Sequence, residues 1–253
     1  MTDRRVRSLE ALVRWNHPQL GAISPAEFVP LAENTGSMGQ LTRWVLANAI
    51  AQLARWRGAG MVSELAVNLS ASDLADAELP DEILALLARH QVQPQQLLLE
   101  ITESAVMREL EQAVRIMRRL RSAGVRFAID DFGTGHSSLA QLKALPVDEL
   151  KIDRTFVREL QPHTRDDAIV RSAVELAHIL GLKVVAEGVE TAVAWTALLR
   201  LGCDYAQGYF VSAPLAPEQV ADWVREANSR LESAESGTAQ VRALTELRSI
   251  RRS

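Results

Sequence analysis

Short apolar segments alternate with longer amphipathic segments along most of the chain. The short segments are rich in Val, Ile and Leu, as is typical of strands buried in a parallel sheet. We expect strands at Val6–Val13, Leu65–Leu69, Leu97–Ile101, Arg126–Ile129, Glu149–Ile152, Lys183–Ala186 and Asp204–Gln207. Helical spacing of apolar residues predicts helices at Met38–Arg57, Asp81–His90, Leu110–Ala123, Asp166–Leu180 and Val193–Leu201.

This alternation predicts a parallel sheet built from strand–helix–strand units. Gly124, Gly181 and Gly202 each follow one of the expected helices, where a left-handed C-cap favours glycine. For a chain of 253 residues, a TIM-type (β/α)8 barrel is favoured over an open doubly wound sheet. We count seven strands, whereas a closed barrel of this type needs eight.

The C-terminal part of the chain has a different composition. A helical turn around Pro217–Asn228 is expected to close the fold, so residues 1–228 are assigned to one domain. Residues 229–253 are polar and predict a tail with a linker at Ser236-Gly237-Thr238. Within this tail, Gln240–Arg252 is expected to be a short basic helix or disordered.

Composition and charge narrow the class of protein. With 47% hydrophobic and 24% charged residues, the chain reads as an ordinary globular protein. A net charge of -4 indicates no general attraction to DNA or to anionic membranes. The single cysteine, Cys203, excludes an internal disulfide and fits a reducing compartment. We find no membrane segment and no secretory signal in the sequence, so a cytoplasmic location is expected.

Polar residues recur where the expected strands end. Six of the seven strands carry an acidic or amide residue at or just past the C-terminal end, and the first carries one in its middle. Any single one of these residues is more often a helix cap or an ion-pair partner than part of a site. Together they converge on the mouth of the barrel, where the catalytic groups of barrel enzymes collect. The residues are Glu10, Asn68, Glu100, Asp130, Asp131, Lys151, Asp153, Glu187 and Gln207.

Several carboxylates at one mouth repel one another, so some must bind protons or cations. Oxygen donors without a Cys–His cluster favour Mg²⁺ or Mn²⁺ over zinc or copper. Asp130 and Asp131 can share a site only if the strand ends there, and Gly133 permits such a turn. Two ions held this way would suit attack on a phosphodiester. Lys151 either acts on the attacking water or forms an ion pair that relieves repulsion, and the sequence leaves both readings open. No Walker loop, GxGxxG after a strand or Ser–His–Asp order favours another chemistry.

These residues occur within longer motifs. The run Glu10-Ala11-Leu12-Val13-Arg14-Trp15 is followed by His17-Pro18 and by the segment Ser24–Glu33, which reads SPAEFVPLAE. Together with the strand-end motifs up to Gln207-Gly208-Tyr209, this order resembles the EAL domain family over residues 6–228.

The resemblance implies a role for each matching position. It implies metal ligands at Glu10, Asn68, Glu100, Asp130 and Asp131, which would hold two ions, Mg²⁺ or Mn²⁺. It implies catalytic roles for Lys151 on the attacking water, Glu187 beside it, Gln207 as its orienting amide, and Glu103 in holding the loop Asp131–Ser138. It implies substrate contacts from Arg14 to a phosphate and from Asp153 to a guanine edge, with Glu190 supporting the site.

The activity implied is hydrolysis of cyclic di-GMP to linear pGpG by a homodimer. The alternatives are a catalytically silent cyclic di-GMP receptor or protein-interaction module, and a barrel enzyme that cleaves other phosphodiesters. The sequence departs from the family in two places. It lacks the usual first antiparallel strand before Glu10, which leaves two barrel edges to be covered. It also has His136 where an aromatic residue is common, which could add pH sensitivity.

Overall fold

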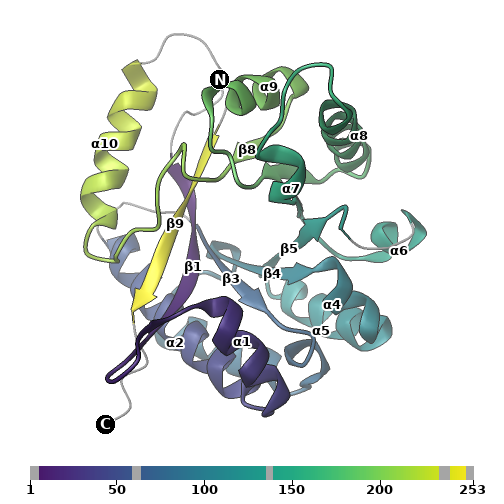
Figure 1. Ribbon diagram of the computed structural model, residues 1–253. Helices are drawn as coiled ribbons and strands as arrows, with labels where there is room; N and C mark the ends of the chain where they lie inside the picture. Colours follow the sequence, from purple (N-terminus) through teal and green to yellow (C-terminus); the bar gives the residue numbers. More distant parts are fainter. Residues whose placement is uncertain (1–5, 59–63, 135–138, 234–239, 249–253) are drawn as a thin grey trace.

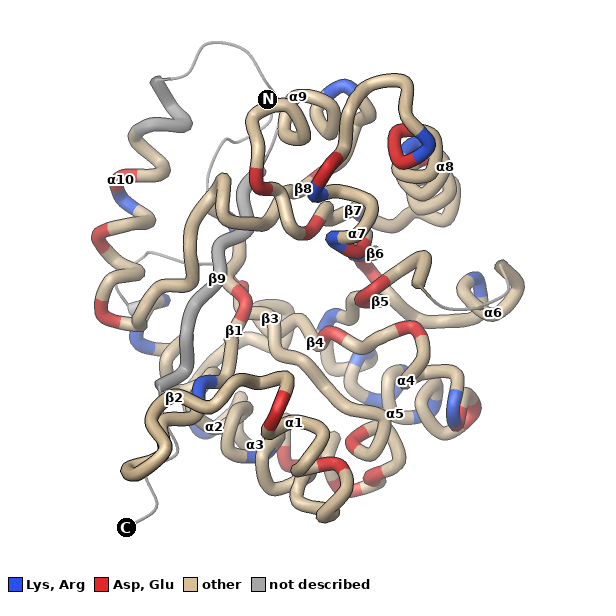
Figure 2. The backbone as a smooth tube through the Cα atoms, in the orientation of Figure 1, with Lys and Arg blue, Asp and Glu red and all other residues tan. Residues whose placement is uncertain are grey.

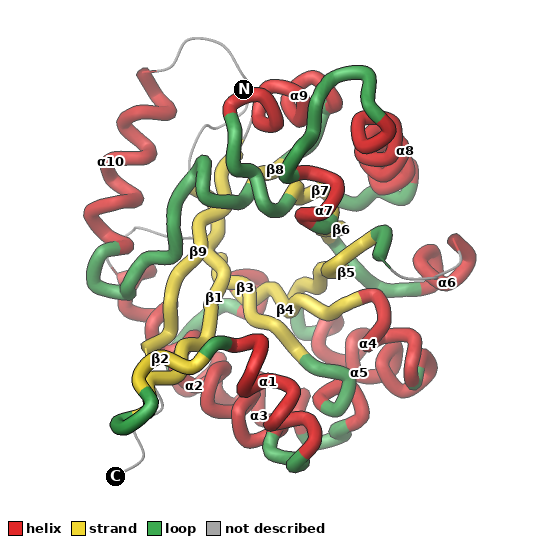
Figure 3. The backbone as a smooth tube through the Cα atoms, in the orientation of Figure 1, coloured by secondary structure: helices red, strands yellow, loops and turns green. Residues whose placement is uncertain are grey.

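The strands of this protein form a closed ring surrounded by helices (Figures 1 and 3). The computed structural model describes residues 6–58, 64–134, 139–233 and 240–248. In spatial order the ring contains β1 (Val6–His17), β3 (Glu64–Leu69), β4 (Leu97–Thr102), β5 (Arg126–Phe132), β6 (Glu149–Ile152), β7 (Lys183–Ala186), β8 (Tyr205–Ala206) and β9 (Gln240–Arg248), which returns to β1. All neighbouring pairs in the ring are parallel. The predicted (β/α)8 barrel is therefore confirmed, in preference to an open sheet.

A short hairpin extends the ring on one side. β2 (Gly21–Ile23) pairs antiparallel with the end of β1, from Trp15 opposite Ile23 to His17 opposite Gly21. β2 is the antiparallel strand of the described sheet, and it lies outside the ring.

Helices cover the outer surface of the ring. They are α1 (Pro25–Asn34), α2 (Met38–Gly58), α3 (Leu79–Arg89), α4 (Glu103–Arg108), α5 (Leu110–Ser122), α6 (Leu139–Ala144), α7 (Arg154–Val157), α8 (Arg165–Ile179), α9 (Ala192–Leu201) and α10 (Val220–Ser233), with 3-10 turns η1 (Asp73–Ala75) and η2 (Pro94–Gln96). The expected helices correspond to α2, α3, α5, α8 and α9. Gly202 ends α9 in the left-handed region, at a φ of 78°, as its place in the sequence predicted. None of the described helices has the length and apolarity needed to cross a membrane.

The interior of the ring is arranged in layers because every second side chain of a strand points inward. At the N-terminal ends of the strands, Arg126 pairs with the buried carboxylates of Glu64 and Glu149. The next residues inward form a small apolar cluster of Ala66, Leu98 and Ala128. The larger core lies outside the ring, between the strands and the helices. The C-terminal ends of the strands are thus left for polar groups.

The last strand of the ring corrects the sequence-based expectation for the tail. Residues 240–248 were expected to be a short helix or disordered, but they form β9. β9 runs parallel to β1 from Val241 opposite Val6 to Arg248 opposite Arg14, and its first two residues pair with β8. Figure 1 shows β9 beside β1.

The physical reason lies in the edge of β1. An unpaired parallel strand presents a row of unsatisfied N–H and C=O groups, and a neighbouring strand satisfies them. β8, α10 and β9 form one more strand–helix–strand unit like those around the rest of the barrel. The side chain of Asn228 on α10 also accepts a hydrogen bond from the backbone N–H of Val6, at 2.8 Å. Residues 240–248 lie within a polar segment of the chain, so their sequence alone did not predict a strand that pairs within the barrel.

Candidate metal and catalytic site

The acidic residues singled out from the sequence meet at the C-terminal mouth of the ring. Figure 2 shows acidic residues from several strands around this opening. Strand register accounts for the meeting, because Asn68 on β3 lies opposite Glu100 on β4, and Glu10 on β1 lies opposite Ala66, two residues before Asn68. Residues in register point to the same side of a sheet, so these side chains share the barrel interior.

Lys151 lies at the centre of this group. Its ammonium nitrogen is 2.6 Å from a carboxylate oxygen of Glu100, 2.7 Å from Glu187, 3.2 Å from Asp130 and 3.8 Å from Glu10. The side chain is fully buried. Burial alone would lower its pKa, but the surrounding carboxylates raise the pKa of Lys151 well above its ordinary value. One ammonium therefore partly neutralises carboxylates from four strands or strand ends.

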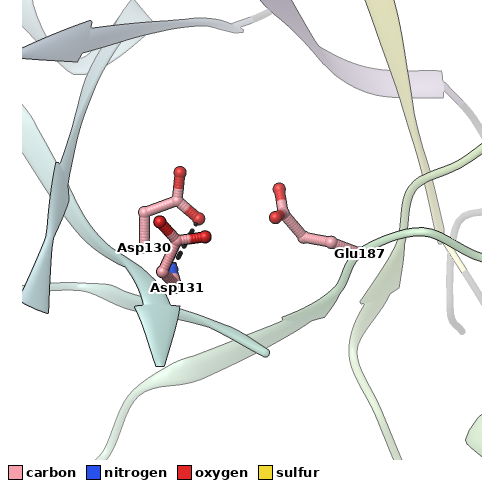
Figure 4. A group of neighbouring side chains, drawn as sticks. All are labelled: Asp130, Asp131 and Glu187. Carbon is pink, nitrogen blue, oxygen red and sulfur yellow. Dashed lines mark hydrogen bonds between the residues drawn. The ribbon is translucent and has the colours of Figure 1, made fainter. Parts of the chain in front are cut away.

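Two of these carboxylates, Asp130 and Glu187, also lie close to that of Asp131. Asp130, Asp131 and Glu187 each offer one oxygen, and these oxygens lie within 4.8 Å of one another. Figure 4 shows the carboxylates of Asp130 and Asp131, from β5, facing the same space as that of Glu187, from the loop after β7. Three oxygens at this separation are arranged to share one cation.

The backbone at Asp131 is what allows adjacent residues to share this site. Asp131 has a φ of 54°, in the left-handed region that residues other than glycine rarely adopt. Its backbone N–H donates to the carboxylate of Asp130 at 2.9 Å. The sequence predicted that the two aspartates could share a site only if the strand ended there, but β5 continues to Phe132. The φ of Asp131, together with the register shift between Ile129 and Phe132, breaks the alternation of side chains instead.

Two of these acids hold their protons unusually tightly. Burial first, and then the negative charges of Asp130 and Asp153, raise the pKa of Asp131 to about 6. Burial chiefly raises the pKa of Glu187 to about 7, although Lys151 opposes the shift. Negative charge is thus in excess in this part of the site, and a bound cation would reduce the repulsion between the carboxylates.

Two amide side chains orient Glu10. Asn68 donates to one oxygen of Glu10 at 2.8 Å, and Gln207 donates to the other at 2.6 Å. Gln207 also lies 3.4 Å from an oxygen of Glu187. The carbonyl oxygen of Gln207 is buried and has no hydrogen-bond partner within the described residues. It is an acceptor available for a water or another donor in the mouth of the barrel.

The other predicted residues lie around the rim. Glu103, at the start of α4, accepts a hydrogen bond from the backbone N–H of Gly133 at 3.3 Å, so it contacts the loop after β5. Residues 135–138 of that loop, including His136, lie outside the described residues. Asp153 caps α7 through the N–H of Thr155, at 2.9 Å. Burial opposes the effect, but hydrogen bonds from Thr155 lower the pKa of Asp153.

Arg14 and Glu190 make no described contact with Lys151. The guanidinium of Arg14 donates to the backbone carbonyl of Val13 at 3.1 Å. Glu190 is exposed and pairs with Arg158 at 3.2 Å. The structure therefore brings most of the predicted site residues together in or around the mouth but places Glu190 on the exposed surface.

A cavity of about 390 Å³ adjoins the acidic group. It lies between β1, α1, α2, β3 and the start of α4, and Asn68 and Arg14 form part of its wall. Sequence reasoning missed Thr42 and Ser70, which also line it. No local signal marks a Thr within α2 or a Ser after β3, because their relation to the cavity arises only when the helices pack on the ring.

The donor set fits a hard divalent cation. Carboxylate and amide oxygens are the ligands that Mg²⁺ and Mn²⁺ prefer, and the described part of the site contains no thiolate or imidazole. The raised pKa values of Asp131 and Glu187 are a second sign of fit, since a cation would favour their charged forms. The residues present can therefore hold a metal ion.

This fold and site define a known class of protein. Residues 1–214 match the family model of the EAL domain, and the chain belongs to that family. It is 47% identical over 213 residues to the bifunctional diguanylate cyclase/cyclic di-GMP phosphodiesterase MucR of Pseudomonas aeruginosa, covering 84% of this chain and 31% of MucR. It is 42% identical over 226 residues to the cyclic di-GMP phosphodiesterase NbdA of the same organism, covering 89% of this chain and 29% of NbdA.

Solved structures agree on the fold. A structure described as PaMucR phosphodiesterase in complex with c-di-GMP superposes with a TM-score of 0.78 at 47% identity, covering 82% of this chain and 84% of that one. The EAL domain of Mycobacterium smegmatis DcpA gives a TM-score of 0.71 at 40% identity, covering 76% of this chain and 86% of that one. The chain spans about a third of the length of the curated relatives described above.

Proposed function

We propose that this protein hydrolyses cyclic di-GMP to linear pGpG. The observation that carries the proposal is the buried Lys151 within 4 Å of carboxylates from β1, β4, β5 and the end of β7. Burying this many carboxylates around one ammonium is costly, and a bound cation would offset part of their mutual repulsion. The names of MucR and NbdA, and the nucleotide bound in the MucR structure, support the choice of substrate.

The cations proposed for the site are two Mg²⁺ or Mn²⁺ ions. Glu10, Asn68, Glu100 and Asp130 would hold one, and Asp130 and Asp131 would hold the other. When bound, such ions lower the pKa of a water and place positive charge beside the phosphate. The close approach of carboxylate oxygens from Asp130, Asp131 and Glu187 supports a cation at this end of the barrel.

In the proposed reaction, the oxygen of a water bonds to phosphorus and the water releases a proton, one P–O bond to ribose breaks, and the leaving oxygen takes up a proton from the solvent. Glu187, whose carboxylate lies 2.7 Å from the ammonium of Lys151, would accept the proton that the water releases. Lys151 would act on the attacking water, as an ammonium that places positive charge beside it, and its hydrogen bonds hold Glu100 and Glu187 in place. The carbonyl oxygen of Gln207 accepts a hydrogen bond from the water and so orients it.

The rim residues are proposed to bind the nucleotide. Arg14 would turn from the carbonyl of Val13 to a phosphate, and Asp153 would accept from a guanine edge. Glu103 would hold the loop after β5 through the backbone of Gly133. Glu190 would support the site from the surface, beside Arg158.

The test is a turnover assay. Purified protein is incubated with cyclic di-GMP and Mg²⁺ or Mn²⁺, and pGpG is measured by chromatography. We expect cleavage, its loss in EDTA, and a fall of about a thousandfold or more in kcat for Lys151→Ala. Folded protein that binds cyclic di-GMP without cleaving it would instead indicate a receptor. Faster cleavage of a generic diester would indicate another phosphohydrolase.

We further propose a homodimer located in the cytoplasm. The dimer is supported by the family resemblance, and the location by the chemistry of an intracellular nucleotide substrate and by the single cysteine. Light scattering of the purified protein tests the first proposal, and cell fractionation of the native protein tests the second.

A further inference from the structure

A buried aspartate outside the acidic group supports one wall of the cavity. Asp73 begins the 3-10 turn η1, after β3, and is 2% exposed. One of its carboxylate oxygens accepts three hydrogen bonds. They come from the backbone N–H of Ser70 at 2.8 Å, the hydroxyl of Ser70 at 2.7 Å and the hydroxyl of Thr42 at 2.8 Å. These bonds tie the loop after β3 to α2.

Burying a carboxylate is unfavourable unless several hydrogen bonds satisfy it. Here the bonds are charge-assisted and therefore stronger than those between neutral groups. Both residues that donate to Asp73, Thr42 and Ser70, also line the cavity beside Asn68. Asp73 thus fixes the hydroxyl groups of Thr42 and Ser70, and both residues form part of the cavity wall.

Asp76 is a nearby aspartate that does not line the cavity, and it serves as a comparison for Asp73. Asp76, three residues further along, pairs with Arg43 at 2.6 Å, and the side chain of Asp76 is 30% exposed. Arg43 also pairs with Glu82 at 2.6 Å, so this ion-pair group joins α2 to α3 at the surface. Neither Asp76 nor Arg43 lines the cavity. Asp76 is therefore a matched control for Asp73.

We propose that Asp73 is a positioning residue for substrate affinity. Through Ser70 and Thr42 it fixes the wall of the cavity that takes part of the nucleotide. The inference rests on the proposed function, because it assigns this cavity to the same substrate. The part of the wall formed by Thr42 and Ser70, unlike that formed by Arg14 and Asn68, is assigned to the non-reacting portion of the nucleotide. Its interaction is therefore equally strong in the ground state and the transition state. Its loss raises KM and leaves kcat unchanged.

The experiment compares four variants in the cyclic di-GMP turnover assay. Thr42→Val keeps the shape of the side chain but removes one donor to Asp73, and Asp73→Asn removes the charge. We expect each to raise KM about tenfold, with kcat within about twofold of the wild type. Thr42→Ser restores the hydroxyl and is expected to restore KM. Asp76→Asn is expected to keep the wild-type KM.

Thermal unfolding of each variant separates positioning from stability. If Thr42→Val and Asp73→Asn are folded at the assay temperature and have wild-type KM, Asp73 only stabilises the turn and the inference is wrong. A fall in kcat at unchanged KM also overturns it. If Asp73→Asn does not fold, the Thr42 pair decides the question. Wild-type protein that neither binds nor cleaves cyclic di-GMP refutes the proposed function itself, whereas an active wild type with indifferent variants refutes only this inference.

Discussion

At the scale of single residues, Lys151 holds together a group of carboxylates that repel one another. Its ammonium is within hydrogen-bonding distance of Glu100 and Glu187, and all three lie at the mouth of the ring. Removing one partner of a buried ion pair leaves uncompensated charge. Lys151 therefore affects both stability and the proposed reaction.

The variant Lys151→Met tests the contribution to stability. In EDTA we expect the free energy of unfolding to fall by about 3–5 kcal/mol, the usual result of breaking a buried ion pair. A cation bound to the same carboxylates should restore part of the loss, so thermal unfolding is measured in EDTA and in excess Mn²⁺. Identical unfolding of wild type and variant in EDTA would show that the carboxylates do not depend on this ammonium.

The pKa values of Glu187 and Asp131 predict how stability depends on pH. Both acids have a higher pKa in the folded protein, about 7 and about 6, than their ordinary values of 4.5 and 3.8. The folded state thus binds their protons more tightly than the unfolded state does. This contribution is fully present below the ordinary values and is lost as the pH rises through 6 and 7.

We therefore expect the melting temperature of the cation-free protein to fall between pH 5 and pH 8. Glu187→Gln removes one of the two groups and should make this fall smaller. Thermal unfolding in EDTA at a series of pH values measures both. A variant whose profile parallels that of the wild type would mean that Glu187 does not titrate in this range.

At the scale of secondary-structure elements, β9 has the least obvious role. The family match ends at residue 214, yet β9 pairs with the strand that carries Glu10 and with the strand that precedes Gln207. Glu10, on one of the two strands that flank β9, and Gln207, directly after the other, form a hydrogen bond of 2.6 Å with each other. The spacing of these two site residues therefore depends on the presence of β9.

A proline within β9 tests this dependence. Ala243→Pro removes a backbone N–H opposite Leu9 of β1 and should disrupt the pairing. We expect kcat for cyclic di-GMP to fall at least about tenfold, because Glu10 and Gln207 lose their fixed separation. Ala243→Ser keeps the N–H and serves as the control. Wild-type kcat in the proline variant would show that the site does not require β9.

At the scale of the whole molecule, the ring holds two charged layers separated by a small apolar one. Arg126 pairs with Glu64 and Glu149 at the N-terminal end of the strands, and Ala66, Leu98 and Ala128 lie between this group and the mouth. The side chains of Glu64 and Glu149 are only 6% and 3% exposed, so they are shielded from water. The charged group at the N-terminal end therefore contributes to stability without belonging to the site proposed for the chemistry.

Arg126→Met should separate these two properties. We expect it to lower the free energy of unfolding by about 3–5 kcal/mol, since each of two buried carboxylates loses an ion pair with Arg126. Below the melting transition, kcat should be unchanged. Arg119→Met is the control, because Arg119 and its partner Asp81 are 49% and 68% exposed and such pairs contribute at most about 1 kcal/mol. Denaturant unfolding and steady-state kinetics measure the two effects, and equal destabilisation by both variants would contradict the prediction.

The sequence by itself determined the barrel class and most of the residues at its mouth. Both depend on local rules. Alternation of strand and helix implies parallel strands, and spacing by two places Glu149 and Lys151, or Ala128 and Asp130, on one face of a strand. The rules also locate the mouth, because the C-terminal ends of parallel strands lie together.

Only the tertiary structure decided the closing strand, the cavity and the contacts of individual side chains. β9 owes its conformation to the exposed edges of β1 and β8 rather than to its own polar composition. Asp73 reads as an ordinary turn residue until α2 brings Thr42 against it, and Glu190 follows a strand yet pairs with Arg158 at the surface. Such contacts join residues far apart in the chain, so their geometry is set by packing and cannot be inferred from local sequence patterns.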